Sequence, residues 1–480
     1  MFKILDKLRI SSFIILLFLN SHAIASENNN MVSLEDNTFN SSNSAVSYKD
    51  LRGIFSTISQ QEYLNFLRLS VIEQPEYLFS ISQMSEKDMF LRYANRQRFP
   101  ELSFQIINDE SIDRDIDDAF SIRKRRDDSF DASVEISQTI YSGGSINAQV
   151  GIARKEFSIS KLMKEEALSS QILRANEVYL KAISSNVLYK YGQSILDEAI
   201  PFLEKVRERV QLGISDPIQL AVFSIKFNNL ESKVQILRTD RNRDVGVYEF
   251  FFKTKFDNES FPEVLIPPLS MDYNRKAYEV ENSILNYEAK KEETKLTRSE
   301  FLPQFGIRTR YTEYDIDDDE GEDSDIRGGI YFSMPVFTFG RASAKISSSK
   351  AKEKAHKQYI DVERKTDDTL ETEIVNVIDS SMTTRKEIFK AYEDTRKQSS
   401  IIKERLEITN FSPDAYIDSA LEELRQLERF IATETSLLHG YMLYKHQNRE
   451  LTSLIRITPW LKKIIQKLKQ TIRIIGFGDQ

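Results

Sequence analysis

Two halves of this chain repeat the same landmarks at one constant offset. Tyr141-Ser142-Gly143-Gly144 corresponds to Phe337-Thr338-Phe339-Gly340, and a long stretch after each ends near a proline, at Pro217 and Pro413. The differences 337 − 141, 340 − 144 and 413 − 217 all equal 196, and Glu208-Arg209 and Glu404-Arg405 keep the same spacing. Chance rarely preserves one offset across four landmarks, so we interpret the pattern as an internal two-fold repeat.

Each repeat begins with two runs in which apolar and polar residues alternate. These runs cover about 101–108 and 131–141 in the first repeat, and about 305–312 and 330–336 in the second. Alternation of this length is typical of a membrane β-barrel strand with one face toward lipid and one toward water. It is equally compatible with a half-buried strand of a soluble sheet, so the pattern alone leaves both open.

The connection between the second pair of runs is strongly acidic. The segment Asp315–Asp325 contains Asp315, Asp317, Asp318, Asp319, Glu320, Glu322, Asp323 and Asp325. Carboxylate oxygens are suitable ligands for Ca²⁺, but the segment lacks the spacing of a calcium-binding loop. We expect a solvated loop outside the cell.

Very long helices are predicted after both pairs of strands. The chain has only 15 Gly and 11 Pro, and Leu168, Ile172, Ala175, Tyr179 and Ala182 follow coiled-coil spacing. A helix over 145–212 would be about 100 Å long, which no compact domain accommodates. Pro201 is expected to kink it.

Returning helices are predicted from the two prolines. Asp216-Pro217 and Ser412-Pro413 each combine an N-cap residue with proline at the first helical position. The first return runs to about Phe252 and resumes over about 272–300, and the second runs to about Ile455. A helix over about 70–98 supplies the missing piece of the second return.

These elements divide the chain into five segments. They are a signal peptide (1–25), an irregular equatorial segment (26–69), repeat 1 (70–270), repeat 2 (271–455) and a basic C-terminal segment (456–480). The last segment is amphipathic and could touch anionic lipid or peptidoglycan. We expect instead that it packs on the middle of the molecule with a solvated basic face.

The first 25 residues have the features of an export signal. Lys3, Lys7 and Arg9 precede a short apolar core, and Ala23-Ile24-Ala25 predicts cleavage before Ser26. Cleavage removes a net charge of +2, so the net charge changes from −8 to −10. An acidic mature chain argues against a nucleic-acid partner.

Residues for catalysis or cofactor binding form no recognisable motif. The absence of Cys excludes disulfides, thiolate metal sites and a cysteine nucleophile. His439 and His446 lie two helical turns apart, too far to share a metal ion, and Ser158-Ile159-Ser160-Lys161 lacks the partner motifs of an S-x-x-K enzyme. We therefore predict no enzymatic activity and no cofactor.

Taken in order, these motifs resemble the TolC-like outer-membrane efflux proteins over nearly all of the mature chain. The resemblance rests on Gln74-Pro75-Glu76, Phe99-Pro100, Leu302-Pro303, Gln138–Gly144, Met334–Gly340 and Arg209–Gly213 before Asp216-Pro217. It implies an α+β membrane protein in which four strands per chain contribute to a trimeric 12-stranded outer-membrane β-barrel. A long antiparallel α-helical coiled-coil barrel continues it into the periplasm of a Gram-negative cell.

The resemblance also implies the function and the site. The chain is expected to be a homotrimeric exit duct that works with a periplasmic adaptor and an inner-membrane ABC or proton-driven pump. Turns at Gly213 and Thr409 form the periplasmic tip, with Asp216, Pro217, Ser412 and Pro413 beside them, and Asp418 falls where family members often carry an acidic pore residue. Asp414, one turn earlier, is its rival. The sequence departs from the family pattern at Thr409, Gln219 and Ala415.

Two functional questions stay open at this point. The cargo could be small molecules or secreted proteins, because the pump selects it. The competing class is a periplasmic coiled-coil adaptor, which predicts one helical hairpin, soluble β-domains and an inner-membrane anchor. The duplicated strand pair and the cleavable signal argue against the adaptor.

Overall fold

The computed structural model describes residues 56–110, 128–257, 260–263, 265–267, 269, 277–314, 316, 323–408 and 414–454. All of them lie in one compact unit. Within this part the elements follow in the order helix, two strands, two helices, and this order occurs twice. The predicted signal peptide and basic C-terminal segment lie outside the described residues.

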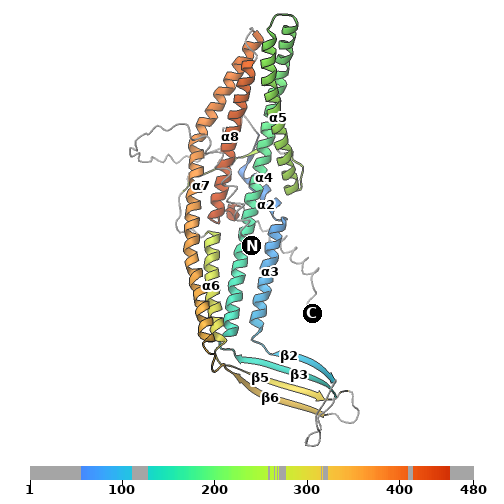
Figure 1. Ribbon diagram of the computed structural model, residues 1–480, viewed down its shortest axis with the longest axis vertical. Coiled ribbons are helices and arrows are strands. Elements are labelled where there is room, and N and C mark those ends of the chain that lie inside the picture. The colour runs from blue at the N-terminus through green and yellow to red at the C-terminus, as the bar shows by residue number, and fades with distance from the viewer. Residues whose placement is uncertain are drawn as a thin grey trace, which may run out of the picture. The chain divides into compact units, whose positions relative to one another are not determined.

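Four strands form one antiparallel sheet in the order β2-β3-β5-β6 (Figure 1). They are β2 Glu101–Glu110, β3 Asp128–Tyr141, β5 Gln304–Tyr314 and β6 Asp323–Ser333. The predicted positions of the first three are confirmed. The fourth prediction was wrong at its end, because Met334 and Val336 lie beyond β6. Pro335 between them has no N–H to donate to a strand ladder.

Two helices of almost equal length follow the strand pairs. α4 covers Ser145–Gln211 with 67 residues, and α7 covers Arg341–Ile408 with 68. At 1.5 Å per residue each is about 100 Å long, as the absence of breakers predicted. α4 continues through Pro201 without interruption.

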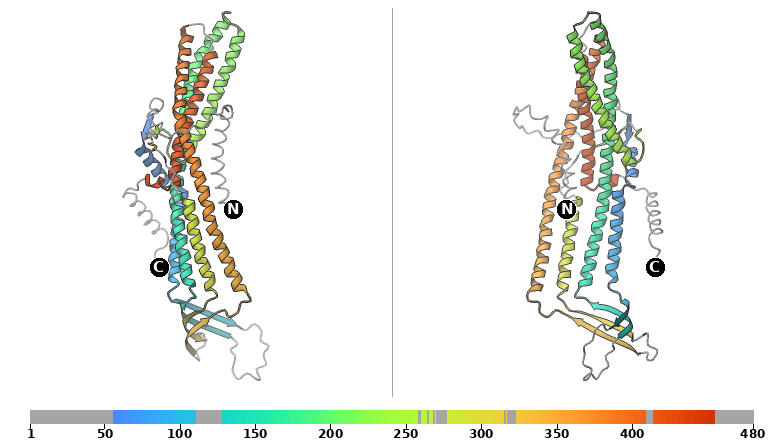
Figure 2. Two further views of the ribbon diagram at one scale, coloured as in Figure 1. Left: turned by 90° about the vertical axis from the view of Figure 1, so that its left-hand side faces the viewer. Right: turned by 45° about the vertical axis from the view of Figure 1, so that its right-hand side comes forward.

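Four shorter helices pack beside the two long ones. α3 and α6 lie next to the sheet, where α3, α4, α6 and α7 contact one another in that order, whereas α5 and α8 occupy the other half (Figures 1 and 2). The bounds are α3 Pro75–Arg96, α5 Pro217–Phe252, α6 Tyr278–Ser299 and α8 Asp414–Gln447. The returning helices therefore match the predictions, with the second return ending in a separate turn, α9 Leu451–Leu454.

A small subdomain packs on one face of this helical layer (Figure 2). β1 Ser56–Ser59 pairs in parallel with β4 Ser260–Glu263, and α2 Gln60–Val71 follows β1 directly. The expectation of irregular structure up to residue 69 was wrong here. Ser59 caps α2 by accepting a hydrogen bond from the Glu62 N–H, which stabilises the first turn.

α2 is held to α4 by a buried aromatic contact. The Tyr63 ring lies 5.0 Å from that of Tyr179, and the Tyr63 hydroxyl donates to Asn176 Oδ1 at 2.6 Å. Tyr179 in turn donates to the Ser260 carbonyl at 3.0 Å. Both rings are fully buried, so the subdomain covers the face of α4 that carries Tyr179.

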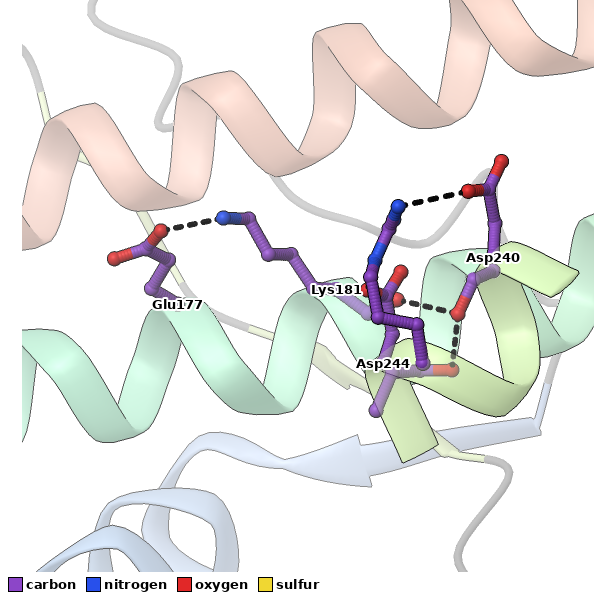
Figure 3. A network of polar contacts seen from close by, with 7 residues as sticks. Glu177, Lys181, Asp240 and Asp244 are labelled. Atoms are coloured by element: carbon purple, nitrogen blue, oxygen red, sulfur yellow. Dashed lines mark hydrogen bonds and ion pairs between the residues drawn. The ribbon is translucent and has the colours of Figure 1, made fainter. Parts of the chain in front are cut away.

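Charged contacts within the layer differ strongly in burial. Glu177 and Lys181 on α4, like Arg243 with Asp240 and Asp244 on α5, are solvated pairs (Figure 3). Each contributes at most about 1 kcal/mol. The pair between Arg385 of α7 and Glu434 of α8 is almost fully buried.

We predict that Arg385→Met lowers the free energy of unfolding by about 3 kcal/mol per chain, because it leaves a buried carboxylate without its partner. The double variant Arg385→Met/Glu434→Met should lose less, because it removes both charges. Thermal unfolding in detergent measures both. Arg364→Met, at an exposed position of the same helix, is the control, and equal losses in the single and double variants would contradict the prediction.

The two histidines of α8 are packing residues, as the sequence indicated. His446 Nδ1 lies 2.7 Å from Ser169 Oγ of α4, and burial lowers its pKa to about 4. Burial also lowers the pKa of His439. Both rings are therefore neutral at pH 7, whereas an unfolded chain binds a proton near pH 6.5.

Stability should accordingly fall as the pH decreases from 6.5 to 4, where the unfolded chain binds the proton and the folded chain does not. The contribution of His446 is on the order of 3 kcal/mol per chain, because burial lowers its pKa from 6.5 to about 4. His446→Gln should reduce this pH dependence in thermal melts recorded between pH 7 and 4. An unchanged pH slope would refute the assignment.

Candidate functional site

The sheet has one apolar face that is exposed to its surroundings. The register places Leu102, Phe104, Ile136, Ile307, Ile330 and Phe332 on this face. Leu102 is 69% exposed and Ile330 is 80% exposed, and no element of the described chain covers them. A continuous apolar surface of this size on a single chain indicates contact with lipid or with another protein.

The opposite face carries charged side chains of both signs that form ion pairs. Glu135 of β3 lies between two arginines of β5, with 2.9 Å to Arg308 Nε and 2.8 Å to Arg310 Nε. On β6, Arg327 pairs with Asp325 of the same strand. Because these side chains need water, the two faces of the sheet require different environments.

Both edges of the sheet are open. β2 pairs only with β3, and β6 pairs only with β5, within the part of the chain described. Each edge presents a row of backbone N–H and C=O groups that need partners. One chain therefore leaves two complementary edges.

At the far end of α4 the chain turns sharply into α5. Gly213 adopts φ of +71°, a conformation that other residues rarely take, and Asp216 Oδ1 accepts from the Ile218 N–H at 2.8 Å. Pro217 stands at the first helical position of α5, as predicted. The second predicted turn, with Thr409, Ser412 and Pro413, lies outside the described residues.

Apolar side chains are exposed at the first turn. Leu212, Ile214 and Ile218 are 72%, 64% and 68% exposed. They flank Gly213 in the sequence, so the turn exposes large apolar side chains. Sequence reasoning named the turn itself and did not single out these three residues.

The two candidate pore carboxylates share one lysine. Lys226 Nζ of α5 lies 3.2 Å from Asp414 Oδ2 and 2.5 Å from Asp418 Oδ2, both on α8. Asp418 and Asp414 raise the pKa of Lys226, with the hydrogen bond to Asp418 as the main cause. The Asp418 side chain stays 59% exposed. The structure thus places Asp414 and Asp418, the two alternatives for the pore residue, in contact with the same lysine.

Sequence reasoning missed Lys226. A signal was present, because Lys226 follows Pro217 by nine residues and Asp418 follows Pro413 by five, as 226 − 217 and 418 − 413 give. Opposite charges thus lie within about three turns of the two prolines, on two helices that follow the predicted turns. Only their packing in three dimensions decides that they meet.

A buried carboxyl lies deeper along the same helices. Tyr191 of α4 donates to Glu423 of α8, and burial raises the pKa of Glu423. Two turns closer to the tip, the Tyr416 hydroxyl donates to Glu198 at 3.0 Å. These contacts hold α8 against α4 from the level of the Lys226 cluster to about two turns below it.

Other kinds of site were sought in the same residues. The described part contains no group of three His, Asp or Glu side chains arranged to hold a metal ion. Among its helices, none has an apolar stretch long enough to cross a membrane.

Comparison with known proteins identifies the fold. No protein-family model and no curated protein matches the sequence. Among solved structures, the Campylobacter jejuni CmeC outer membrane channel superimposes with a TM-score of 0.72 at 13% identity, covering 92% of this chain and 97% of CmeC.

Two further channels superimpose over most of their length. The Vibrio cholerae outer membrane protein VceC gives a TM-score of 0.62 at 13% identity, with 80% of this chain and 97% of VceC covered. The open state of the Neisseria gonorrhoeae MtrE outer membrane channel gives 0.65 at 9% identity, covering 81% and 89%. The chain therefore has the fold of these channels, as its resemblance to the TolC-like proteins implied.

Proposed function

We propose that this protein is the outer-membrane exit duct of a tripartite efflux or type I secretion system. The observation that carries the proposal is the four-stranded sheet, with an exposed apolar face, a charged opposite face and two open edges. Such a sheet fits lipid on one side and a water-filled lumen on the other. The helices of about 100 Å would continue the lumen into the periplasm.

A homotrimer follows from the edges. Lipid supplies no hydrogen bonds, so membrane strands must close on themselves, and four strands are too few to do so. The β2 edge of one chain would pair with the β6 edge of the next. Three chains then give a 12-stranded barrel.

The helices support the same closure. α3 leads into the edge strand β2, and α7 follows the other edge strand β6. The two outer helices next to the sheet therefore lie on the same two sides of the chain as the two open strand edges. Both sides expose large apolar side chains, among them Phe79 and Tyr93 on α3, Phe250 on α5 and Val362 on α7. Phe250 is 87% exposed, and contact between neighbouring chains would cover it.

The repeated order of elements supports the internal two-fold repeat. α4 and α7 begin at residues 145 and 341, which reproduces the offset of 196. A duct made from two similar halves per chain presents six similar units around the axis. This arrangement gives the strands and the helices one common symmetry.

The two ends of the molecule are proposed to face different surroundings. The apolar residues around Gly213 are the proposed contact for a periplasmic adaptor, which connects the duct to an ABC or proton-driven pump in the inner membrane. The acidic segment 315–325, most of which lies outside the described residues, is proposed to face the exterior. An adaptor role for this chain itself has no support, because the sheet contains strands from both halves of the chain.

Membrane fractionation tests the proposal directly. The protein should appear in the outer membrane, begin at Ser26, and migrate as a trimer on gels without heating and as a monomer after heating. An epitope inserted between residues 317 and 322 should be labelled on intact cells. Recovery from the inner membrane with Met1 retained would refute the proposal.

The charges at the tip predict its ion selectivity. In a trimer Asp418 would occur three times around the axis, where enclosing helices limit screening and focus the field. Asp418→Ala should therefore reduce cation selectivity, measured as the reversal potential of single channels in a salt gradient. If Asp414 forms the ring instead, only Asp414→Ala will reduce cation selectivity.

Lys226 predicts the opposite change. Lys226→Gln removes the cation that compensates both carboxylates, so cation selectivity should increase. Lys233→Gln is the matched control. Lys233 of α5 also pairs with α8, where its Nζ lies 2.7 Å from Glu428 Oε1, but this pair does not include either aspartate. If Asp414→Ala, Asp418→Ala and Lys226→Gln all leave the ion selectivity unchanged, these residues do not line the narrowest point.

A further inference from the structure

A basic cavity lies where the helices meet the sheet. It has a volume of about 640 Å³ and opens between α4, α6 and the start of β2. Its charged lining consists of Arg98, Arg154, Lys155, Lys295, Arg298 and Glu292. Five cations thus surround one carboxylate.

The two lysines are already neutralised. Lys155 lies 2.5 Å from Glu288, and Lys295 lies 2.7 Å from Glu292. Among the described residues the three arginines have no acidic partner, and Arg98 donates only to the neutral Asn147 Oδ1 at 3.0 Å. Three guanidinium groups therefore leave a net positive charge in the cavity.

Two glycines give the cavity its shape. A Cβ on Gly143 would come within 2.8 Å of the Ser299 carbonyl, and a Cβ on Gly151 within 2.8 Å of Glu292 Oε2. The missing side chains allow the start of α4 to approach α6 closely. The arginines are consequently held around one space instead of spreading apart.

The cavity opens on the outer face of the helical layer. Gly151 is separated by 28 residues, four heptads, from Tyr179, so both lie on the same face of the coiled-coil helix α4. Tyr179 is covered there by α2 and β4. A subdomain on the inner face would obstruct the lumen, so this face is the outer one.

The height of the cavity matches that of lipid headgroups. The exposed apolar face of the sheet begins at Leu102, and Phe99 next to it is 69% exposed. Exposed aromatic residues at the end of an apolar band typically mark the boundary between lipid tails and water. Arg98 precedes Phe99 directly, on the side that leads into the helices.

We infer that this cavity binds the phosphate group of an anionic phospholipid in the inner leaflet of the outer membrane. Guanidinium groups bind phosphate oxygens through paired, charge-assisted hydrogen bonds, and three of them are available without disrupting an ion pair. Bound lipid would fix the height of the duct in the membrane. The inference rests on the proposed function for the position of the membrane.

Titration of the purified trimer with short-chain lipids tests the inference. Dihexanoyl phosphatidylglycerol should bind at three equivalent sites, at least tenfold more tightly than dihexanoyl phosphatidylcholine. Arg98→Gln/Arg154→Gln/Arg298→Gln should weaken binding of the anionic lipid at least tenfold. Arg207→Gln/Arg238→Gln/Arg364→Gln, which changes the same charge at exposed positions away from the cavity, should not.

Each contrary outcome has a definite meaning. Equal affinity of the first triple variant and the wild type overturns the inference, provided that the variant still migrates as a trimer. Inorganic phosphate that binds as tightly as the lipid also overturns it, because the site would then serve a free anion. A wild-type protein that is not a trimer, or that forms no conducting channel, would instead refute the proposed function.

Discussion

The need to satisfy backbone hydrogen bonds at two open sheet edges constrains this molecule more than any other interaction. The apolar face of β2, β3, β5 and β6 suits lipid, which cannot supply hydrogen bonds to β2 or β6. The proposed trimer meets this need, because each open edge would pair with the edge of another copy of the chain. Because α3 leads into β2 and α7 follows β6, the same proposed pairing would also bring the exposed apolar sides of the helices together.

Charge is arranged in a different way at each level of the chain. On the polar face of the sheet, Glu135 pairs with both Arg308 and Arg310, and Asp325 pairs with Arg327, so charges of both signs are interspersed. Near the tip, Asp414 and Asp418 both contact Lys226, so one cation lies between two carboxylates. Where the sheet meets the helices, arginines without acidic partners leave an excess of positive charge. In the proposed duct these three regions would be a lumen, a narrow aperture and a lipid boundary, and each charge balance suits its region.

Much of the fold could be predicted from the sequence, because the relevant signals are local. Alternation located β2, β3 and β5, and the absence of breakers predicted the lengths of α4 and α7. Asp216-Pro217 predicted the start of α5, since an N-cap and its proline act within one helical turn. The end of β6 was misplaced because the alternating pattern continues across Pro335, although proline cannot continue the ladder.

The sequence by itself determined the period, length and order of the elements, because these depend on neighbours within a few residues. Only the tertiary structure decided which distant groups meet. The pairing of Lys226 with Asp414 and Asp418, the packing of α2 on Tyr179, and the convergence of Arg98, Arg154 and Arg298 on one cavity all join segments far apart in the chain. Such contacts depend on which helices pack side by side and in which register, and the period of a single sequence specifies neither.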